Sequence, residues 1–465
     1  MEIISITDNY SVSGELNRNT IEKLANLGVG SLINVRPDGE AQGQMSSREY
    51  AAICQDFGLT YIHIPVKSGE DIYQLSGFLE MASGVRLSND PIIGTDKTLS
   101  DLRLQVQFDY DLQASQFSFV SDAYFDGVLE QTRINIREAT WEARLGFLGA
   151  WGNRFDAKVG QQVLTWGTGD NVFLNDLFPK DFQSFFAGRE VEYLKSPSLS
   201  AKVSAYFDVF NLDVVLTPEF EPDVYINGDY FSFFLPTAAT QVALGFDVTP
   251  PLRPQSPEYA LRLYKSVGTS EYAGYFYSGF HKSPNSLTQD YRPTFSSLNV
   301  YGASFRTTLG NGIFNAEFAY YDSVDDENGD KPLVPNGQAR WLLGYEQEIV
   351  GNLEGSLQLY TESILDHQAL IQNSLTPKFE PKQHRVWFSQ RLRYKGMQQA
   401  LVLNAFNFYS TTDKDGYLKV SAEYSPVDLW RLSGGLNIFY GKQPFTFWGQ
   451  FEDASNFFVR FRYFY

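Results

Sequence analysis

The chain is predicted to be mainly β: an antiparallel transmembrane barrel of about eighteen strands that follows a small α/β segment. Three observations predict this fold. Short segments from about residue 73 to residue 465 alternate apolar and polar residues, which is the period of a strand with two different faces. The connections between them are sorted into short and long ones, as in barrels that cross membranes. Aromatic residues make up 16% of the 465 residues, which favours strands and membrane-interface girdles.

The alternation is clearest over residues 101–112. Every second position there is apolar or aromatic, and the positions between them carry charges or amides. The apolar positions are Leu102, Leu104, Val106, Phe108, Tyr110 and Leu112. A strand places alternate side chains on opposite sides of a sheet, whereas a helix does not. One side of such a strand suits lipid and the other suits water.

Eighteen strands are expected along the chain. They lie near residues 75–87, 98–112, 115–128, 134–148, 153–164, 195–208, 210–217, 258–266, 271–281, 296–309, 312–322, 338–349, 352–362, 383–394, 398–409, 416–425, 428–440 and 456–465. Even-numbered connections are tight, whereas the odd-numbered ones include long loops at residues 165–194, 217–257, 323–337, 363–382 and 441–455. We therefore expect a closed barrel in which both chain ends of the barrel lie on the short-turn side.

The last strand ends on an aromatic residue. Its apolar face carries Phe457, Val459, Phe461, Tyr463 and Tyr465, and its polar face carries Asn456, Arg460 and Arg462. This stretch resembles the closing strand of Gram-negative outer-membrane barrels, in which assembly factors read the terminal residue. The resemblance implies outer-membrane lipid and the barrel-assembly machinery as partners.

The composition excludes several classes of function. Lys and Arg number 37 against 55 Asp and Glu, a net charge of −18, which argues against a nucleic-acid partner because it offers no basic footprint. The single cysteine, Cys54, excludes an internal disulfide framework. The sequence contains no run of about 18 apolar residues, as a transmembrane helix would need. Its first residues, MEIISITDNYSVSGEL, do not read as a secretory signal peptide, so we expect a start further upstream or a fused chain.

Residues 1–70 are predicted to form a separate α/β segment, before the barrel domain at residues 73–465. Strands are expected at residues 10–16, 31–35 and 60–66, and helices at residues 19–27 and from Ser46 or Ser47 to Phe57. Gly28 and Gly58 end the helices. The order β-α-β-α-β predicts parallel strands.

Three sequence stretches of this segment are also informative. YSVSGEL at 10–16, LINVRPDGE at 32–40 and YIHIPV at 61–66 resemble the phosphatase-like domain of the β-lactamase-hydrolase-like family. That resemblance implies a nucleophilic cysteine in a Cys-x5-Arg loop, because the chemistry needs a thiolate and an arginine around the phosphate. Cys54 has Thr60, not arginine, six positions later and lies in a predicted helix. We therefore expect a truncated phosphatase-like segment without a catalytic residue.

Positions that alternate with the lipid-facing stripe carry charges of both signs. The lumen-lining candidates are Arg103, Asp109, Glu142, Arg144, Arg391, Arg393, Arg460 and Arg462. Charges on the wall of a water-filled channel select among ions and polar solutes. The alternative is that these charges pair across the interior and only hydrate it.

The sharpest local feature is VLTWGTGDNVFLNDLFPKDFQSFF at residues 163–186. Together with Gln161 and Gln162 it resembles stretches of the large outer-membrane porin-like families of proteobacteria. Its length, its glycines and its three carboxylates, Asp170, Asp176 and Asp181, predict a segment that folds inward, narrows the pore and favours cations. The alternative is a packed surface loop whose aromatics join the outer girdle.

Neither a metal nor a cofactor is expected. The acidic run at residues 325–330 departs from the EF-hand spacing at Val324. The barrel histidines, His281, His367 and His384, stand at no spacing that marks a catalytic triad or a zinc site.

The expected function is an outer-membrane porin-like channel for small polar or charged solutes, located in the bacterial outer membrane. One alternative is a barrel enzyme such as a lipase, which needs a serine and a histidine gathered at one lipid boundary. The other is a phosphatase-like hydrolase with a barrel appendage, against which the missing Cys-x5-Arg loop argues.

Overall fold

The computed structural model describes residues 3–7, 10–14, 16–39, 44–63, 72–112, 114–243 and 254–465. The chain divides into two compact units, Met1–Ile72 and Tyr73–Tyr465. Across the described ranges, helices are all too short or too polar to cross a membrane.

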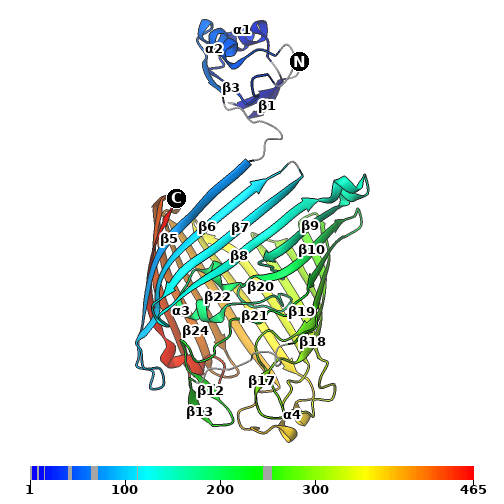
Figure 1. Ribbon diagram of the computed structural model, residues 1–465, viewed down its shortest axis with the longest axis vertical. Helices are drawn as coiled ribbons and strands as arrows, with labels where there is room; N and C mark the ends of the chain where they lie inside the picture. The colour runs from blue at the N-terminus through cyan, green and yellow to red at the C-terminus, as the bar shows by residue number, and fades with distance from the viewer. Residues whose placement is uncertain are drawn as a thin grey trace. The chain divides into compact units, whose positions relative to one another are not determined.

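The larger unit is a closed antiparallel barrel of eighteen strands (Figure 1), so the predicted fold class and strand number are confirmed. All eighteen predicted strands overlap observed ones. The observed strands are β5 (Ile72–Arg86), β6 (Lys97–Asp111), β7 (Ser115–Asp126), β8 (Gln131–Arg144), β9 (Phe155–Gln162), β10 (Ser198–Tyr206), β11 (Asn211–Thr217), β14 (Glu258–Val267), β15 (Ser270–Phe280), β18 (Ser297–Leu309), β19 (Gly312–Ser323), β20 (Gln338–Val350), β21 (Leu353–Ile364), β22 (His384–Gly396), β23 (Leu401–Ser410), β24 (Asp415–Val427), β25 (Trp430–Gly441) and β26 (Asn456–Phe464).

The barrel closes because its last strand pairs with its first. Residues of β26 lie antiparallel to β5, with Asn456 opposite Arg86 and Phe464 opposite Phe78. Closure leaves no strand edge, so the backbone groups of every strand have a neighbour on both sides.

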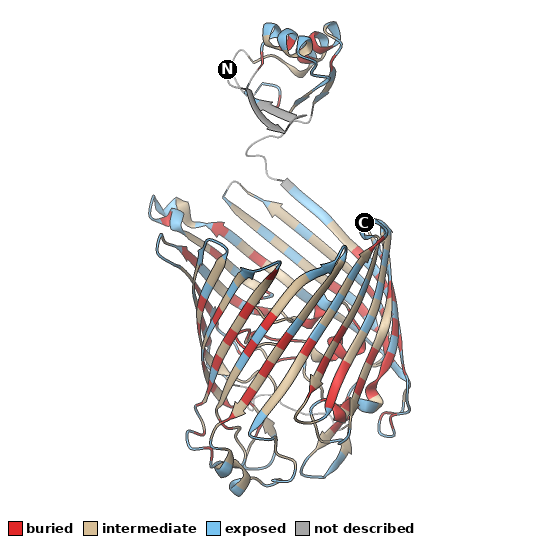
Figure 2. Ribbon diagram, turned by 180° about the vertical axis from the view of Figure 1, so that it is seen from behind, coloured by how far each residue is buried: buried red, intermediate tan, exposed pale blue. Residues whose placement is uncertain are grey.

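The strands alternate between two surroundings, as Figure 2 shows by its bands of buried and exposed residues. On β6, Leu104 is 42% exposed and its neighbour Arg103 only 2% exposed. On β26, Phe461 and Tyr463 are exposed, whereas Arg460 and Arg462 are buried. The apolar set therefore covers the outside of the barrel and the charged set points inward.

The connections differ at the two ends of the barrel. Two-residue turns at 268–269 and 310–311 join consecutive strands, and Gly268 and Gly310 both have a φ near +60°, which tight hairpin turns require. One even-numbered connection is longer than predicted, because residues 145–154 form two 3-10 helices, η1 (Leu145–Leu148) and η2 (Gly152–Arg154). The long connections lie at the opposite end.

The long connections contain short elements of their own. These are α3 (Phe182–Ala187), η3 (Val191–Leu194), β12 (Phe233–Leu235), β13 (Thr240–Val242), β16 (Ser286–Leu287), β17 (Pro293–Thr294), α4 (His367–Asn373) and η5 (Gly449–Ala454). A further 3-10 helix, η4 (Met397–Gln399), lies in a short connection.

The smaller unit has the predicted helices, α1 (Arg18–Asn26) and α2 (Ser47–Asp56), and two parallel strands, β3 (Ser31–Asn34) and β4 (Thr60–His63). Ser46 caps α2 through a reciprocal pair with Glu49, which fixes where that helix begins.

The prediction that all strands of this unit are parallel was wrong for the first one. β2 (Tyr10–Ser13) pairs antiparallel with β1 (Ile3–Thr7), a strand that was not predicted. Antiparallel neighbours need only a short connection, whereas a parallel pair needs a crossover. The isoleucine-rich run just upstream of β2 therefore pairs with it. The predicted strand at 60–66 ends at His63 within the described residues, and its last three positions lie outside them.

Tryptophan fluorescence can test which side of the wall faces lipid. Trp341 is 53% exposed on the apolar side of β20, whereas Trp448 is 5% exposed inside the barrel. In lipid vesicles, a protein that keeps only Trp341, with its other tryptophans changed to phenylalanine, should be quenched strongly by brominated acyl chains. A protein that keeps only Trp448 should be quenched weakly, and equal quenching of the two would contradict the assignment.

Candidate pore constriction

Residues 163–197, which join β9 to β10, form a segment that crosses the inside of the barrel. We call it the crossing segment; it contains α3 and η3. Although both of its ends lie on neighbouring strands, it contacts β19, β21 and β22 on one side and β6 and β26 on another. β22 is nine strands from β9 in the eighteen-strand ring. The crossing segment therefore reaches the opposite wall.

One carboxylate of β19 holds the tip of the crossing segment. Glu317, which is buried, accepts hydrogen bonds from the backbone N–H groups of Thr168 and Gly169, the latter at 2.8 Å, and from the Thr168 hydroxyl at 2.8 Å. The Asn175 amide donates to its second oxygen at 2.8 Å. Gly167 has a φ of +84°, a conformation that favours glycine and allows the chain to turn its N–H groups toward Glu317.

Asp170 lies next to this tip and forms an ion pair with the far wall. Its Oδ2 is 2.9 Å from Nε of Arg391 on β22, and Arg391 also contacts Glu346 of β20 at 2.8 Å. The Asp170 side chain is 22% exposed, and those of Arg391 and Glu346 are more so. Gln358 accepts the Asp170 N–H at 3.1 Å. These three charges are thus fixed in place and still accessible to water.

Asp176 occupies a different environment. Its side chain is 2% exposed, and its oxygens lie 2.9 Å from Nζ of Lys180 and 2.9 Å from Nζ of Lys195. Two lysines neutralise one carboxylate inside the crossing segment, so Asp176 serves to fold that segment.

Asp181 caps α3. Its carboxylate accepts the Ser184 N–H at 2.7 Å and the Ser184 hydroxyl at 2.6 Å, the usual task of an N-cap aspartate. The three predicted constriction residues therefore do not form one cluster, and only Asp170 faces a charge on the barrel wall.

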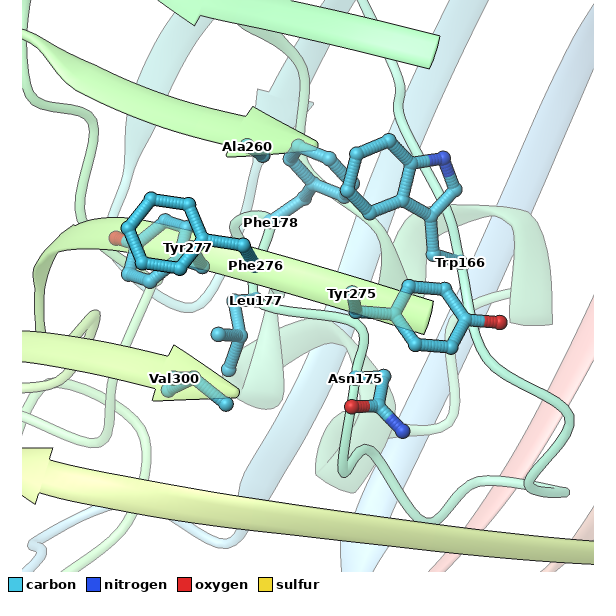
Figure 3. Close-up of a pocket in the computed structure, with 9 residues that line it drawn as sticks. All are labelled: Trp166, Asn175, Leu177, Phe178, Ala260, Tyr275, Phe276, Tyr277 and Val300. Atoms are coloured by element: carbon cyan, nitrogen blue, oxygen red, sulfur yellow. The ribbon is translucent and has the colours of Figure 1, made fainter. Parts of the chain in front are cut away.

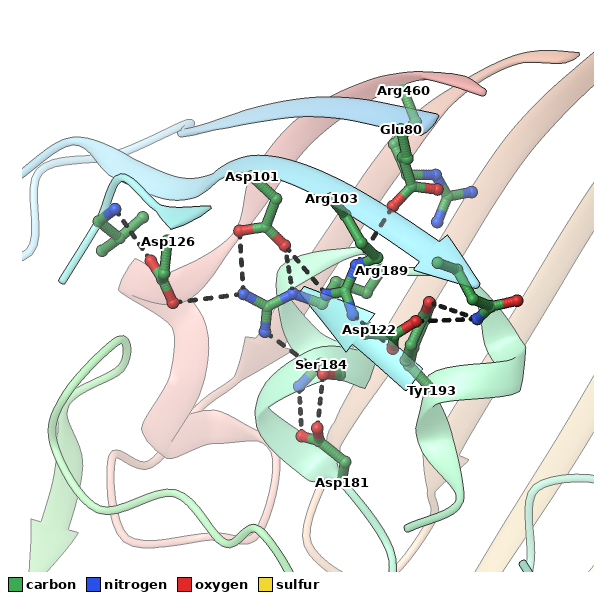
Figure 4. A network of polar contacts seen from close by, with 12 residues as sticks. Glu80, Asp101, Arg103, Asp122, Asp126, Asp181, Ser184, Arg189, Tyr193 and Arg460 are labelled. Carbon is green, nitrogen blue, oxygen red and sulfur yellow. Dashed lines mark hydrogen bonds and ion pairs between the residues drawn. The ribbon is translucent and has the colours of Figure 1, made fainter. Parts of the chain in front are cut away.

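A cluster of arginines and acids holds the second half of the crossing segment (Figure 4). Arg189, which follows α3, forms a two-pronged ion pair with Asp101 of β6 at 2.7 and 3.1 Å, and lies 3.6 Å from Asp126. These side chains are almost fully buried. Breaking such a pair leaves an uncompensated charge in the interior, which is costly.

Three of the predicted lumen residues belong to this cluster. Arg103 contacts Asp122 at 2.9 Å and lies over the ring of Tyr193 in the crossing segment. Arg460 contacts Glu190 at 2.8 Å. Arg462 bridges Glu80 at 2.7 Å and Glu192 at 2.9 Å. These arginines point inward but hold the crossing segment.

The remaining predicted lumen residues line the wall nearer the short-turn end. Glu142 lies 3.7 Å from Lys158, and Arg144 lies 3.5 Å from Asp156 on the neighbouring strand. Asp109 accepts a hydrogen bond from Gln107 at 2.7 Å. Arg393 is half-buried on β22, two residues beyond Arg391. Charges of both signs therefore line this part of the inner face.

Aromatic packing also fixes α3. Phe186 lies 4.9 Å from Phe439 of β25 and 5.1 Å from Phe451 of η5, centre to centre. Phe185 contacts Tyr417 of β24 at 5.6 Å. Part of the aromatic content thus packs inside the barrel, where buried rings stabilise a contact by both area and geometry.

A small cavity lies between the crossing segment and β14, β15 and β18 (Figure 3). Trp166 packs edge-on against Phe178 at 5.1 Å and also meets Tyr275. The cavity has a volume of about 10 Å³, which is room for about one water molecule. The segment is therefore closely packed against this wall.

A second inward segment was not identified from the sequence. Residues 218–243, part of the connection from β11 to β14, run along the crossing segment: Asp223 accepts the Lys180 N–H at 2.8 Å, and Val224 exchanges backbone hydrogen bonds with Lys180 and Phe182. Tyr230 donates a hydrogen bond to Asp126. The run of aromatics in YFSFF at 230–234 was the available signal, because an exposed loop rarely carries so many.

Cys54 lies on α2, fully buried. Burial raises the pKa of its thiol, which disfavours the thiolate that a nucleophile needs. Among the described residues, no group of three or more side chains is suited to bind a metal ion.

One serine and histidine pair is close in space. Ser363 Oγ and His384 Nδ1 are 3.0 Å apart on adjacent strands. Nucleophilic catalysis also needs a third group to orient the imidazole and donors for an oxyanion. Among the described contacts, Ser363 is the hydrogen-bond partner of the His384 ring.

One family model matches the N-terminal part of the chain. Residues 2–93 match the family model of the beta-lactamase hydrolase-like protein, phosphatase-like domain. The matched range runs past Ile72 and across β5. No curated protein matches the chain.

Solved structures similar to this chain include an outer-membrane channel. OccK5 (OpdH) of Pseudomonas aeruginosa has a TM-score of 0.49 and 9% identity, covering 84% of this chain and 97% of that one. OccK11 (OpdR) of the same organism has a TM-score of 0.47 and 11% identity, covering 84% and 95%. The DcaP channel of Acinetobacter baumannii has a TM-score of 0.42 and 12% identity, covering 86% and 99%.

Arg189→Leu should release the second half of the crossing segment. The change removes the two-pronged partner of Asp101, which keeps only the longer contact to Arg103 at 3.5 Å, and it removes the arginine beside Asp126. Breaking a buried ion pair of this kind costs about 3 to 5 kcal/mol. Native-state hydrogen exchange of residues 182–194 should show that loss of protection, while the barrel strands stay protected. Arg154→Leu, at an exposed arginine of η2, is the control. Unchanged exchange in the Arg189 variant would mean that aromatic packing alone holds the segment.

Cys54 should be unreactive in the native chain and dispensable for any hydrolysis. A thiol reagent should label it only after denaturation, because the side chain is buried. With an aryl phosphate as substrate, Cys54→Ser and the unaltered protein should give the same rate. Loss of a measurable rate in the serine variant would show that the phosphatase-like segment is catalytic.

Proposed function

We propose that the chain is a porin-like channel of the bacterial outer membrane that passes small polar or charged solutes. The observation that carries this proposal is the crossing segment: it spans a closed barrel and places Asp170 against Arg391 and Glu346 on the far wall. A charged constriction in a water-accessible lumen is how a pore selects solutes.

The outer surface supports a membrane location. Exposed residues on the outward positions are leucine, valine, phenylalanine, tyrosine and tryptophan on strands around the barrel. Such a band is costly in water and favourable in lipid. The Gram-negative outer membrane is the location that matches this form.

The inner face near the short-turn end supports a water-filled lumen. The side chains of Glu142, Lys158, Glu354 and Lys395 point inward and are each between 28% and 52% exposed. These groups form local ion pairs, and side chains left this open still contact water, which charged groups favour over an apolar environment. Their mixed signs favour small polar or charged solutes over apolar ones.

We propose that selectivity depends on Asp170 rather than on all three predicted aspartates. On this proposal, ions in the lumen meet Asp170, whose side chain is paired with Arg391 and 22% exposed. Asp176 is already paired with two lysines and Asp181 with the start of α3. A carboxylate at a narrow, poorly screened point affects passing ions more than a carboxylate that is already paired.

The phosphatase-like segment is proposed to be non-catalytic. Its one thiol is buried on a helix, and the sequence lacks the Cys-x5-Arg loop that binds a phosphate in the family it resembles. The channel activity is therefore assigned to the barrel alone.

The proposal predicts that Asp170→Asn lowers the preference for cations. The change removes a negative charge beside Arg391, which keeps its contact with Glu346 at 2.8 Å, so the constriction becomes more positive. In planar bilayers with a salt gradient, the unaltered barrel should conduct, and the reversal potential of the variant should shift toward anion preference.

Glu327→Gln is the matched control, because it makes the same carboxylate-to-amide change at an exposed loop residue and should leave the reversal potential unchanged. The same potential for Asp170→Asn and the unaltered protein would place the selectivity elsewhere. No conductance from either protein would sink the channel proposal.

A further inference from the structure

A hollow lies on the outside of the barrel, over strands β21 to β26. Strands β21 to β26 enclose a depression of about 450 Å³ there, with an almost entirely apolar lining. Its floor is made by small residues on the outward positions of three neighbouring strands: Ala405, Ala422 and Gly434. Its rim is made by Leu353, Leu392, Tyr394, Leu403, Val420, Leu436 and Phe457. We call this surface the outer hollow.

The strand register shows why the hollow forms. Ala422 lies between Leu403 and Gly434 in one cross-strand row, and Ala405 lies between Leu392 and Val420 in the next. Cross-strand neighbours contact one another on a sheet face. Three small side chains in adjoining rows therefore leave a gap that the large ones surround.

The next row along the same face carries amides in place of apolar residues. Gln390 of β22 pairs with Asn407 of β23, and the Asn407 Nδ2 group donates to Gln390 Oε1 at 3.3 Å. The Tyr440 hydroxyl donates to the Asn407 Oδ1 atom at 3.0 Å. Gly416 makes room for the Tyr440 ring, because a Cβ there would meet the Tyr440 hydroxyl at 2.3 Å. Gln390 is exposed.

Gln390 lies in the middle of its strand, whereas Asn407 lies three residues from the end of β23 (Leu401–Ser410). Gln390 is six residues from either end of β22 (His384–Gly396), so it faces the depth at which the other outward positions carry leucine and phenylalanine. An amide that faces hydrocarbon is unfavourable unless something there accepts and donates hydrogen bonds. The surface that covers Gln390 therefore has hydrogen-bonding groups.

Small residues and amides together favour a protein partner. Within lipid, association gains little from burying apolar area, because lipid tails are already apolar; it gains from close approach at small residues and from hydrogen bonds between amides. A lipid tail can fill the outer hollow but cannot satisfy Gln390.

We propose that the outer face of β22 to β25 binds the same face of a second copy of this chain in the membrane. Glutamine and asparagine amides both donate and accept, so each is complementary to its own kind. A two-fold contact brings identical patches together, and large rim residues of one copy can enter the hollow of the other. The proposal rests on the barrel face lying in the membrane and does not depend on solute passage.

The test is the number of copies in each particle at low density in lipid nanodiscs or vesicles, counted by stepwise photobleaching of one dye per chain. Ala422→Trp fills the hollow from the outside and should abolish association. Gln390→Leu removes the amide and should weaken association about threefold to twentyfold, the range for one hydrogen bond between segments in a membrane. Both side chains point away from the lumen, so single-channel conductance per barrel should stay the same.

Ala303→Trp is the control, because Ala303 is an exposed alanine on β18, away from the hollow, and should leave the count unchanged. Pairs for the unaltered protein and the control, with single barrels for Ala422→Trp and a smaller fraction of pairs for Gln390→Leu, would support the proposal. Single barrels for the unaltered protein, including barrels that retain a bound lipid, would overturn it. Pairs that persist in both variants would also overturn it, by placing the contact on another face.

Discussion

Backbone hydrogen bonding in the absence of water is the constraint on which the rest of this structure depends. In hydrocarbon an unpaired N–H or C=O group costs several kcal/mol, so a sheet that crosses a membrane has to close, and here β26 pairs with β5. Closure then forces every strand to present alternate side chains to two solvents. The apolar exterior and the charged interior both follow from that requirement.

Packing inside the barrel follows a different logic from packing outside it. The tip of the crossing segment donates hydrogen bonds to the Glu317 carboxylate. From α3 onward, the segment is held by aromatic rings and by the Arg189–Asp101 ion pair. The interior of the barrel is thus packed like the core of a soluble domain. Because the charges are paired locally, the segment keeps one position, and Asp170 is presented at a fixed point.

The strands were predictable from the sequence because a period of two needs no knowledge of distant contacts. Leu104 and Arg103 could be assigned to opposite faces from their order alone. The site was less predictable, since Asp170, Asp176 and Asp181 look alike in sequence. Their different environments depend on partners far away in the chain, such as Arg391 for Asp170 and Lys195 for Asp176. The second inward segment was missed because loops lack periodicity, and the β1–β2 pairing because strand choice depends on competition between neighbours.

The pairing of β5 with β26 also limits how the barrel can form. The two strands that complete the ring lie at opposite ends of the barrel sequence, with Phe78 opposite Phe464. Every other pair of neighbouring barrel strands is also consecutive along the chain. Pairing β5 with β26 has to bring the two ends of the barrel chain together, at an entropic cost that grows with chain length. Such long-range contacts slow folding. Until the last strand arrives, both terminal strands expose unpaired edges, so the unclosed barrel is the species most exposed to aggregation.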